Sequence, residues 1–176
     1  VLSQANSGQA SALSNAFAAS SGTIIATLDS DDEWRPEKLT RAVEFVQAFP
    51  GGGVYQHQLE TSRGPKRASL VSGDVFGAWK AWDNGAFNIA DAFDGLSFSP
   101  FVPTSGLFFR REVLAKSMPI PVEIRACADA YLTRTCAAWG PLLSMPETLV
   151  TWRDHGDNAC LDDRNNFSNF WAPVIM

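Results

Sequence analysis

The chain has 176 residues, 45% of them hydrophobic, and a formal net charge of −5. This length and apolar content suit a single domain, residues 1–176, with a sizeable core. The negative charge argues against a nucleic-acid partner, and no apolar run approaches the roughly twenty residues of a membrane-spanning helix.

The first third of the chain predicts alternating helices and strands. Small and apolar residues over 8–20 favour a helix that Ser7 can cap and Gly22 can end. Residues 23–28 are apolar and rich in β-branched side chains, which is typical of a buried strand. A second helix is expected from Pro36 onward, and residues 54–59 read as the next strand. The apolar face of the second helix would consist of Leu39, Val43, Val46 and Phe49.

The remainder is less regular. Residues 60–104 predict loops with one short helix near 75–82, where Trp79 and Trp82 could stack on a sugar. A helix over 129–139 ends at Gly140-Pro141. The other expected elements are strands at 106–110, 142–144 and 148–153, a short helix beginning over 112–116, and a short terminal helix at 165–171. This alternation indicates an α/β fold.

Three carboxylates, Asp29, Asp31 and Asp32, follow the strand at 23–28 within four positions. Carboxylates this close repel one another unless a cation lies among them. The carboxyl end of a parallel strand is also where open α/β sheets bind ligands. The segment therefore predicts a site for Mg²⁺ or Mn²⁺, shared with a phosphate-bearing substrate.

Three other interpretations of this acidic segment compete. A solvated acidic turn could simply cap the helix that follows. A calcium loop of the EF-hand type would need Gly at Trp34 and Glu at Thr40, and so fails twice. A phosphatase of the haloacid dehalogenase type would need Thr or Val where Glu33 stands, and fits poorly.

The flanking residues favour the metal site. Upstream runs N-x-G-Q-A-S-A-L, beginning at Asn6, and downstream D-S-D-D-x-W-x-P-x-K-L, beginning at Asp29. Later come S-G-L-F-F-R-R from Ser105, Ala-Asp at 128–129, and W-R-D-H-G-D-N from Trp152. In this order the motifs resemble those of the family 2 inverting glycosyltransferases with the GT-A fold. The resemblance implies a partial GT-A three-layer sandwich with a mixed, mostly parallel sheet.

The resemblance also implies roles for single residues. Asp31 would bind the metal that bridges the diphosphate, Asp29 would contact the ribose or the metal, and His155 would complete the metal shell or meet the diphosphate. Asp129 would take the proton from the acceptor hydroxyl, although the family's usual Glu-Asp pair is here Ala-Asp. The alternative for Asp129 is a helix N-cap, which is compatible with the catalytic role.

The Asn6, Gly8 and Gln9 stretch would form a wall of the donor site, at a strand-to-helix junction that favours anions. The alternative for this stretch is an ordinary capped start of a helix. The alternative for His155 is an ordinary polar surface residue, as a lone histidine in a loop often is. His57 lies in no motif and is expected to be structural.

The motifs begin where the family's first, base-binding portion would already have ended. The expected function is therefore metal-assisted transfer of a sugar from a nucleoside diphosphate sugar to a carbohydrate acceptor hydroxyl in the intact enzyme. The alternative is a catalytically silent module that self-associates through an uncovered strand edge, and a homo-oligomer is expected. Cys127, Cys136 and Cys160 show no metal-ligand spacing, which favours reduced thiols and a cytoplasmic location.

Overall fold

A mixed β-sheet lies at the centre of the computed structural model, which describes residues 1–62, 86–87, 102–124, 127–153 and 155. The strands are β1 (Ile24–Ala26), β2 (Glu33–Trp34), β3 (Val54–Thr61), β4 (Ala86–Phe87), β5 (Leu107–Arg110) and β6 (Leu142–Trp152). The helices are α1 (Gly8–Ala19), α2 (Lys38–Ala48), α6 (Arg111–Leu114) and α7 (Ala128–Ala137), with 3-10 turns η2 (Thr104–Gly106) and η3 (Ala115–Ser117). The predicted α/β class is confirmed.

The strand order is β1-β5-β3-β6-β2, with β4 paired to β6. Only the pairing of β3 with β6 is parallel among the described strands, so the expectation of a mostly parallel sheet was wrong. The reason is that β2 and β4 run against β6, and that β5 lies between two strands of opposite direction to its own. Strands β1, β3 and β6 run in one direction, but β5 lies between β1 and β3 and runs against both. One reversed strand thus turns two neighbouring pairs antiparallel.

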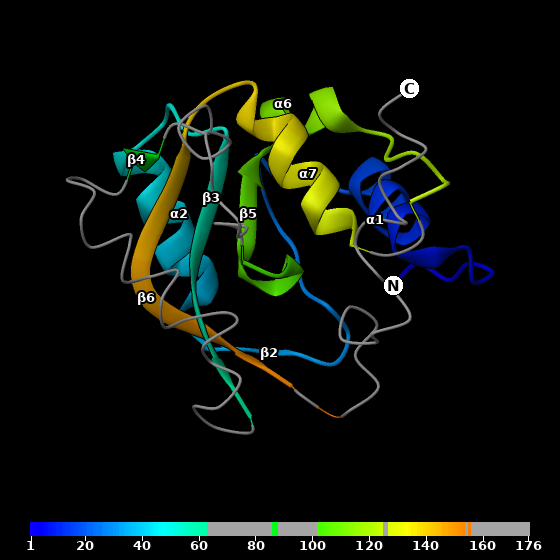
Figure 1. Cartoon of the computed structure of the whole chain (residues 1–176), viewed down its shortest axis with the longest axis horizontal. Coiled ribbons are helices and arrows are strands. Elements are labelled where there is room, and N and C mark those ends of the chain that lie inside the picture. Colours follow the sequence, from blue (N-terminus) through cyan, green and yellow to red (C-terminus); the bar gives the residue numbers. More distant parts are fainter. Residues whose placement is uncertain (63–85, 88–101, 125–126, 154, 156–176) are drawn as a thin grey trace, which may run out of the picture.

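Helices cover both faces of this sheet, as a three-layer sandwich requires (Figure 1). On one face α1, α6 and α7 pack against Leu107 and Phe109 of β5. On the other face α2 packs against Phe108 of the same strand and Tyr55 of β3. Successive side chains of a strand point to opposite faces, so β5 contributes to both cores.

The start of α1 follows the sequence, but its caps do not. Ser7 makes no side-chain cap: its hydroxyl bonds to the Ala5 carbonyl oxygen at 3.3 Å. Asn6 supplies the acceptor instead, because its Oδ1 receives the Gly8 N–H at 3.2 Å. The helix ends at Ala19, with Ser20 in extended conformation, so Gly22 is not its terminator.

Two other sequence expectations were wrong. The strands expected at 142–144 and 148–153 are one strand, β6, and the register shift opposite His57 and Gln58 accommodates the intervening residues. On α2, Leu39 and Val43 are exposed, whereas Lys38 and Ala42 are buried. The helix therefore turns a different stripe inward from the one its largest apolar residues suggest.

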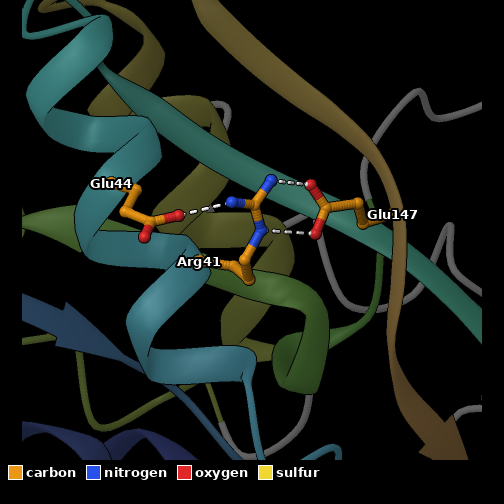
Figure 2. A network of polar contacts seen from close by, with 3 residues as sticks. All are labelled: Arg41, Glu44 and Glu147. Carbon is orange, nitrogen blue, oxygen red and sulfur yellow. Dashed lines mark hydrogen bonds and ion pairs between the residues drawn. The ribbon is translucent and has the colours of Figure 1, made fainter.

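An exposed ion-pair network joins α2 to β6 on the outside of the sandwich. Figure 2 shows the Arg41 guanidinium between two carboxylates: its Nε and Nη2 donate to Glu147 at 2.8 and 2.5 Å, and its Nη1 donates to Glu44. Solvent screens such pairs, so this network fixes the approach of α2 to β6 more than it stabilises the fold.

Several expectations lie outside the described residues, namely the helices at 75–82 and 165–171, the Trp79 and Trp82 pair, and Cys160. Within the described part, no helix has both the length and the hydropathy needed to cross a membrane. His57 is completely buried in the core, in keeping with a structural role.

Candidate active site

The acidic loop leaves the sheet directly after β1 and is held against η2. The Thr27 hydroxyl donates to the Thr104 carbonyl oxygen at 2.6 Å, and the Asp29 N–H donates to the Ser105 hydroxyl at 3.0 Å. The Asp32 N–H then returns to the Asp29 carbonyl oxygen at 3.2 Å, which closes a turn. Hydrogen bonds at both ends of this loop therefore fix its path after β1, and with it the positions of the three carboxylates.

The Gln9 side chain lies at the centre of the inner part of the site. Its Nε2 donates to Asp29 Oδ1 at 3.0 Å and to the Thr104 hydroxyl at 3.1 Å. Its Oε1 accepts the Ala128 N–H at 3.0 Å. Residues from the start of α1, the acidic loop, η2 and the start of α7 thus meet around one carboxamide.

Asp129 lies in the first turn of α7 beside this cluster. The N-cap of α7 is Cys127, with φ 55° and ψ 39°, so the alternative reading of Asp129 as the N-cap was wrong. The Asp129 carboxylate instead accepts the Ala130 N–H at 2.8 Å. A negative charge in the first turn interacts favourably with the helix dipole.

The outer part of the site lies where the chain leaves β6. His155 Nε2 and Asp31 Oδ2 are 2.8 Å apart, and both side chains are about 40% exposed, at 42% and 41%. Asp32 is 8% exposed, and its Oδ1 accepts the Arg153 N–H at 2.9 Å. The segment after β6 therefore packs on the acidic loop, as the order of the motifs suggested.

Burial and crowding change the acidity of these carboxyls. Burial, with the neighbouring Asp129 and Asp32, raises the pKa of Asp29 to about 6, against the opposing hydrogen bond from Gln9. Burial also raises the pKa of Asp32 and of Asp129. Raised pKa values in a group of neighbouring carboxyls are typical of functional sites and make each carboxylate a better proton acceptor.

The fit to a metal ion is partial. Asp31 and His155 offer a carboxylate oxygen and an imidazole nitrogen side by side, and one buried oxygen of Asp32, Oδ2, has no hydrogen-bond partner among the residues that the structure describes. The Asp29 carboxylate accepts a hydrogen bond from Gln9 Nε2 through one of its oxygens, Oδ1, at 3.0 Å. In the parts of the chain that the structure describes, no three His, Cys, Asp or Glu side chains gather into a metal cage. Such a donor set fits an ion that takes further oxygens from a diphosphate.

Not all predicted residues reach the site. Asn6 is exposed and serves as the cap of Gly8, whose φ of 84° lies in the left-handed region that favours glycine. The sequence analysis missed Thr104, which bonds to both Thr27 and Gln9. Its only signal was its place just before the S-G-L-F-F-R-R motif.

The family model described as "Glycosyl transferase family 2" matches residues 1–117. The chain belongs to glycosyl transferase family 2. The match contains Gln9, Asp29 and Asp31, whereas Asp129 and His155 lie beyond it.

An uncharacterized glycosyltransferase of Nostoc sp. (strain PCC 7120) is 35% identical over 167 residues. The alignment covers 88% of this chain and 47% of that relative, so the chain spans about half the length of the curated relative it matches.

Solved structures of S. aureus TarS share the fold. The chain resembles TarS 1–349 with a TM-score of 0.61 at 18% identity, covering 84% of this chain and 41% of that one. The complex of TarS with UDP gives 0.61 at 16% identity and covers 84% and 40%, and that with UDP-GlcNAc gives 0.59 at 16% and covers 87% and 41%. These likenesses confirm the predicted GT-A type of fold.

Proposed function

We propose that this chain carries the diphosphate-binding residues and the catalytic base of a family 2 inverting glycosyltransferase. The substrate class is a nucleoside diphosphate sugar, and the acceptor is a carbohydrate hydroxyl. One observation carries the proposal: Gln9 bonds both to Asp29 and to the Ala128 N–H at the start of α7, and Asp129, a hundred residues after Asp29 in the chain, is near enough to raise the pKa of Asp29.

Asp129 is the proposed base. In inverting transfer the acceptor oxygen forms its bond to the anomeric carbon while the bond from that carbon to the diphosphate oxygen breaks. The acceptor proton passes to the Asp129 carboxylate. Burial raises the pKa of this carboxyl, which increases its basicity, and the Ala130 N–H fixes one of its oxygens.

The acidic loop is the proposed diphosphate side. Asp31, His155 and Asp29 would hold a Mg²⁺ or Mn²⁺ ion together with diphosphate oxygens. When bound, such an ion supplies charge neutralisation for the departing nucleoside diphosphate. Related support comes from TarS, whose structures contain UDP and UDP-GlcNAc. UDP-GlcNAc is therefore the first donor to test.

The test is release of nucleoside diphosphate from a panel of UDP-, GDP- and dTDP-sugars with Mn²⁺, with and without carbohydrate acceptors. We expect release that Asp129→Asn lowers by at least about 100-fold, because the base contributes that much in such reactions. Glu123→Gln, an exposed carboxylate elsewhere, is the matched control and should leave release unchanged. Release that survives Asp129→Asn would contradict the assignment. Binding of UDP and Mn²⁺ without any release would favour the alternative of a silent binding module.

A further inference from the structure

The Gln9 side chain makes three hydrogen bonds inside the protein. Both donors of its amide nitrogen are taken, by Asp29 Oδ1 at 3.0 Å and by the Thr104 hydroxyl at 3.1 Å. Its oxygen accepts the Ala128 N–H at 3.0 Å. A side chain bonded in this way has no N–H donor left for a nucleotide.

The chemistry of the partners fixes the orientation of the carboxamide. A main-chain N–H can only donate, so Ala128 requires the oxygen of Gln9. A carboxylate accepts, so Asp29 requires the nitrogen. Neither Glu nor Leu at this position could satisfy both partners at once. The two contacts therefore select a carboxamide of the length of glutamine.

The Ala128 N–H is an informative partner. It opens α7, and the first N–H groups of a helix have no acceptor within the helix. The N-cap residue, Cys127, does not cap this helix with a side-chain hydrogen bond. Gln9 thus caps α7 from another element, one residue before Asp129. The same side chain holds Asp29, so a single carboxamide links the acidic loop to the helix that carries Asp129.

The N-x-G-Q motif places Gln9 at this point. Asn6 accepts the Gly8 N–H, and Gly8 adopts a φ of 84°, which lets α1 begin in a sharp turn. Gln9 follows at the first turn of α1, partly buried, with its side chain directed to the site. Asn6, Gly8 and Gln9 of the motif therefore act together on one contact.

We propose that Gln9 is a positioning residue that sets the distance between the Asp29 carboxylate and the first turn of α7, and hence Asp129. The inference rests on the proposed function in one respect, that Asp29 and Asp129 serve one transfer site. Gln9 itself touches neither donor nor acceptor in this scheme.

The first test is amide hydrogen exchange of Ala128, followed by NMR in the chain without ligand. In Gln9→Leu the Ala128 amide should exchange about tenfold faster, because its hydrogen bond is lost. The amide of Leu132, inside α7, is the internal control and should be unaffected. Gln9→Glu alone should also loosen the contact, because it sets a second carboxylate against Asp29.

An exchange of partners gives the sharpest variant. In Gln9→Glu combined with Asp29→Asn, the amide and the carboxylate trade places, so that residue 29 donates to residue 9 and residue 9 still accepts from Ala128. Protection of the Ala128 amide should return to within about threefold of wild type, since the Ala128 N–H and the side chains of residues 9 and 29 each regain a partner. Loss of protection in the double variant as large as in Gln9→Leu would overturn the proposal. So would unchanged protection in Gln9→Leu.

Turnover of UDP-GlcNAc separates positioning from direct donor binding. A positioning role predicts that Gln9→Leu lowers kcat by about 10- to 100-fold with KM little changed, because misplacement of reacting groups affects the chemical step. A raised KM with unchanged kcat would show that Gln9 binds the donor and would contradict the proposal. An inactive wild type would count against the proposed function, while the exchange experiment still decides the role of Gln9.

Discussion

Asp29→Asn should stabilise the ligand-free chain, although it removes a proposed functional group. The Asp29 carboxyl is partly buried among Asp32 and Asp129, and its pKa rises from the ordinary 3.8 to about 6. The folded state therefore holds a proton between those two pH values that the unfolded state has already released. By linkage, the free energy of unfolding falls as pH rises from about 4 to about 6, and the cost remains in full above pH 6.

The size of the effect follows from the shift. About two pKa units, at 1.36 kcal/mol each, correspond to at most about 3 kcal/mol at pH 7.5. Asparagine keeps an oxygen that can accept the hydrogen bond from Gln9, so little else is lost. Below about pH 4 the wild-type carboxyl is protonated in both states, and the two proteins should be equally stable.

Urea denaturation at pH 3.5, 5 and 7.5 measures this difference directly. We expect the Asp29→Asn variant to gain stability over wild type progressively with pH. Glu123→Gln, an exposed carboxylate, is the control and should show no such trend. A variant that is equal to or less stable than wild type at pH 7.5 would refute the reasoning that Asp29 is held in an unfavourable environment. Such tension between stability and site chemistry is common in active sites.

Three other predictions follow from the fold. Lys38 is 1% exposed, and burial lowers its pKa from 10.5 to about 7, so the free energy of unfolding of the wild type should rise between pH 7 and 10.5. In urea denaturation, Lys38→Met should remove that rise and gain up to about 4 kcal/mol of stability at pH 7. A Lys38→Met variant with the wild-type slope would contradict this. Gly53→Ala should lower the melting temperature sharply because its Cβ would lie 2.3 Å from the Gly140 carbonyl oxygen, whereas Gly51→Ala, with open space around it, should not; similar losses in both would refute the packing argument. Strand β1 is an edge of the described sheet, so sedimentation should show a homodimer that Ile24→Lys dissociates; a monomeric wild type at high micromolar concentration would exclude this.

The local elements were predictable because each rests on short-range patterns. The β-branched run before Asp29 predicted β1, and helical spacing with a glycine and proline boundary predicted α7. The path of the sheet was not predictable in this way. The reversed direction of β5 depends on which strands it lies between, and nothing in its own sequence, Leu107–Arg110, records that neighbourhood.

The buried face of α2 was predicted wrongly for a similar reason. Its largest apolar residues suggested one stripe, but Lys38 inserts between Trp34 and Phe108, with Nζ 5.8 and 4.6 Å from the two ring centres. Phe108 comes from a strand seventy residues later in the chain. The rotation of the helix is thus set by a distant partner, and a window of local sequence does not contain it.

The candidate site was predictable as a set of residues but not as an arrangement. Motif order pointed to Asp29, Asp31, Asp129 and His155. The pairing of Asp31 with His155, and the bridge from Asp29 through Gln9 to α7, are contacts across more than a hundred residues. They follow from the packing of α1, α7 and the segment after β6 around the end of β1.

The central claim is that the acidic loop binds a metal–diphosphate group, and calorimetric titration of UDP in the presence of Mn²⁺ tests it most directly. We expect that wild type binds UDP only with Mn²⁺, and that Asp31→Ala weakens this binding about tenfold or more, as expected for loss of a charged ligand. Glu44→Ala, which removes an exposed carboxylate of the Arg41 network, is the control and should bind as wild type does. Equal UDP affinity in wild type and Asp31→Ala, or binding that does not depend on Mn²⁺, would contradict the account.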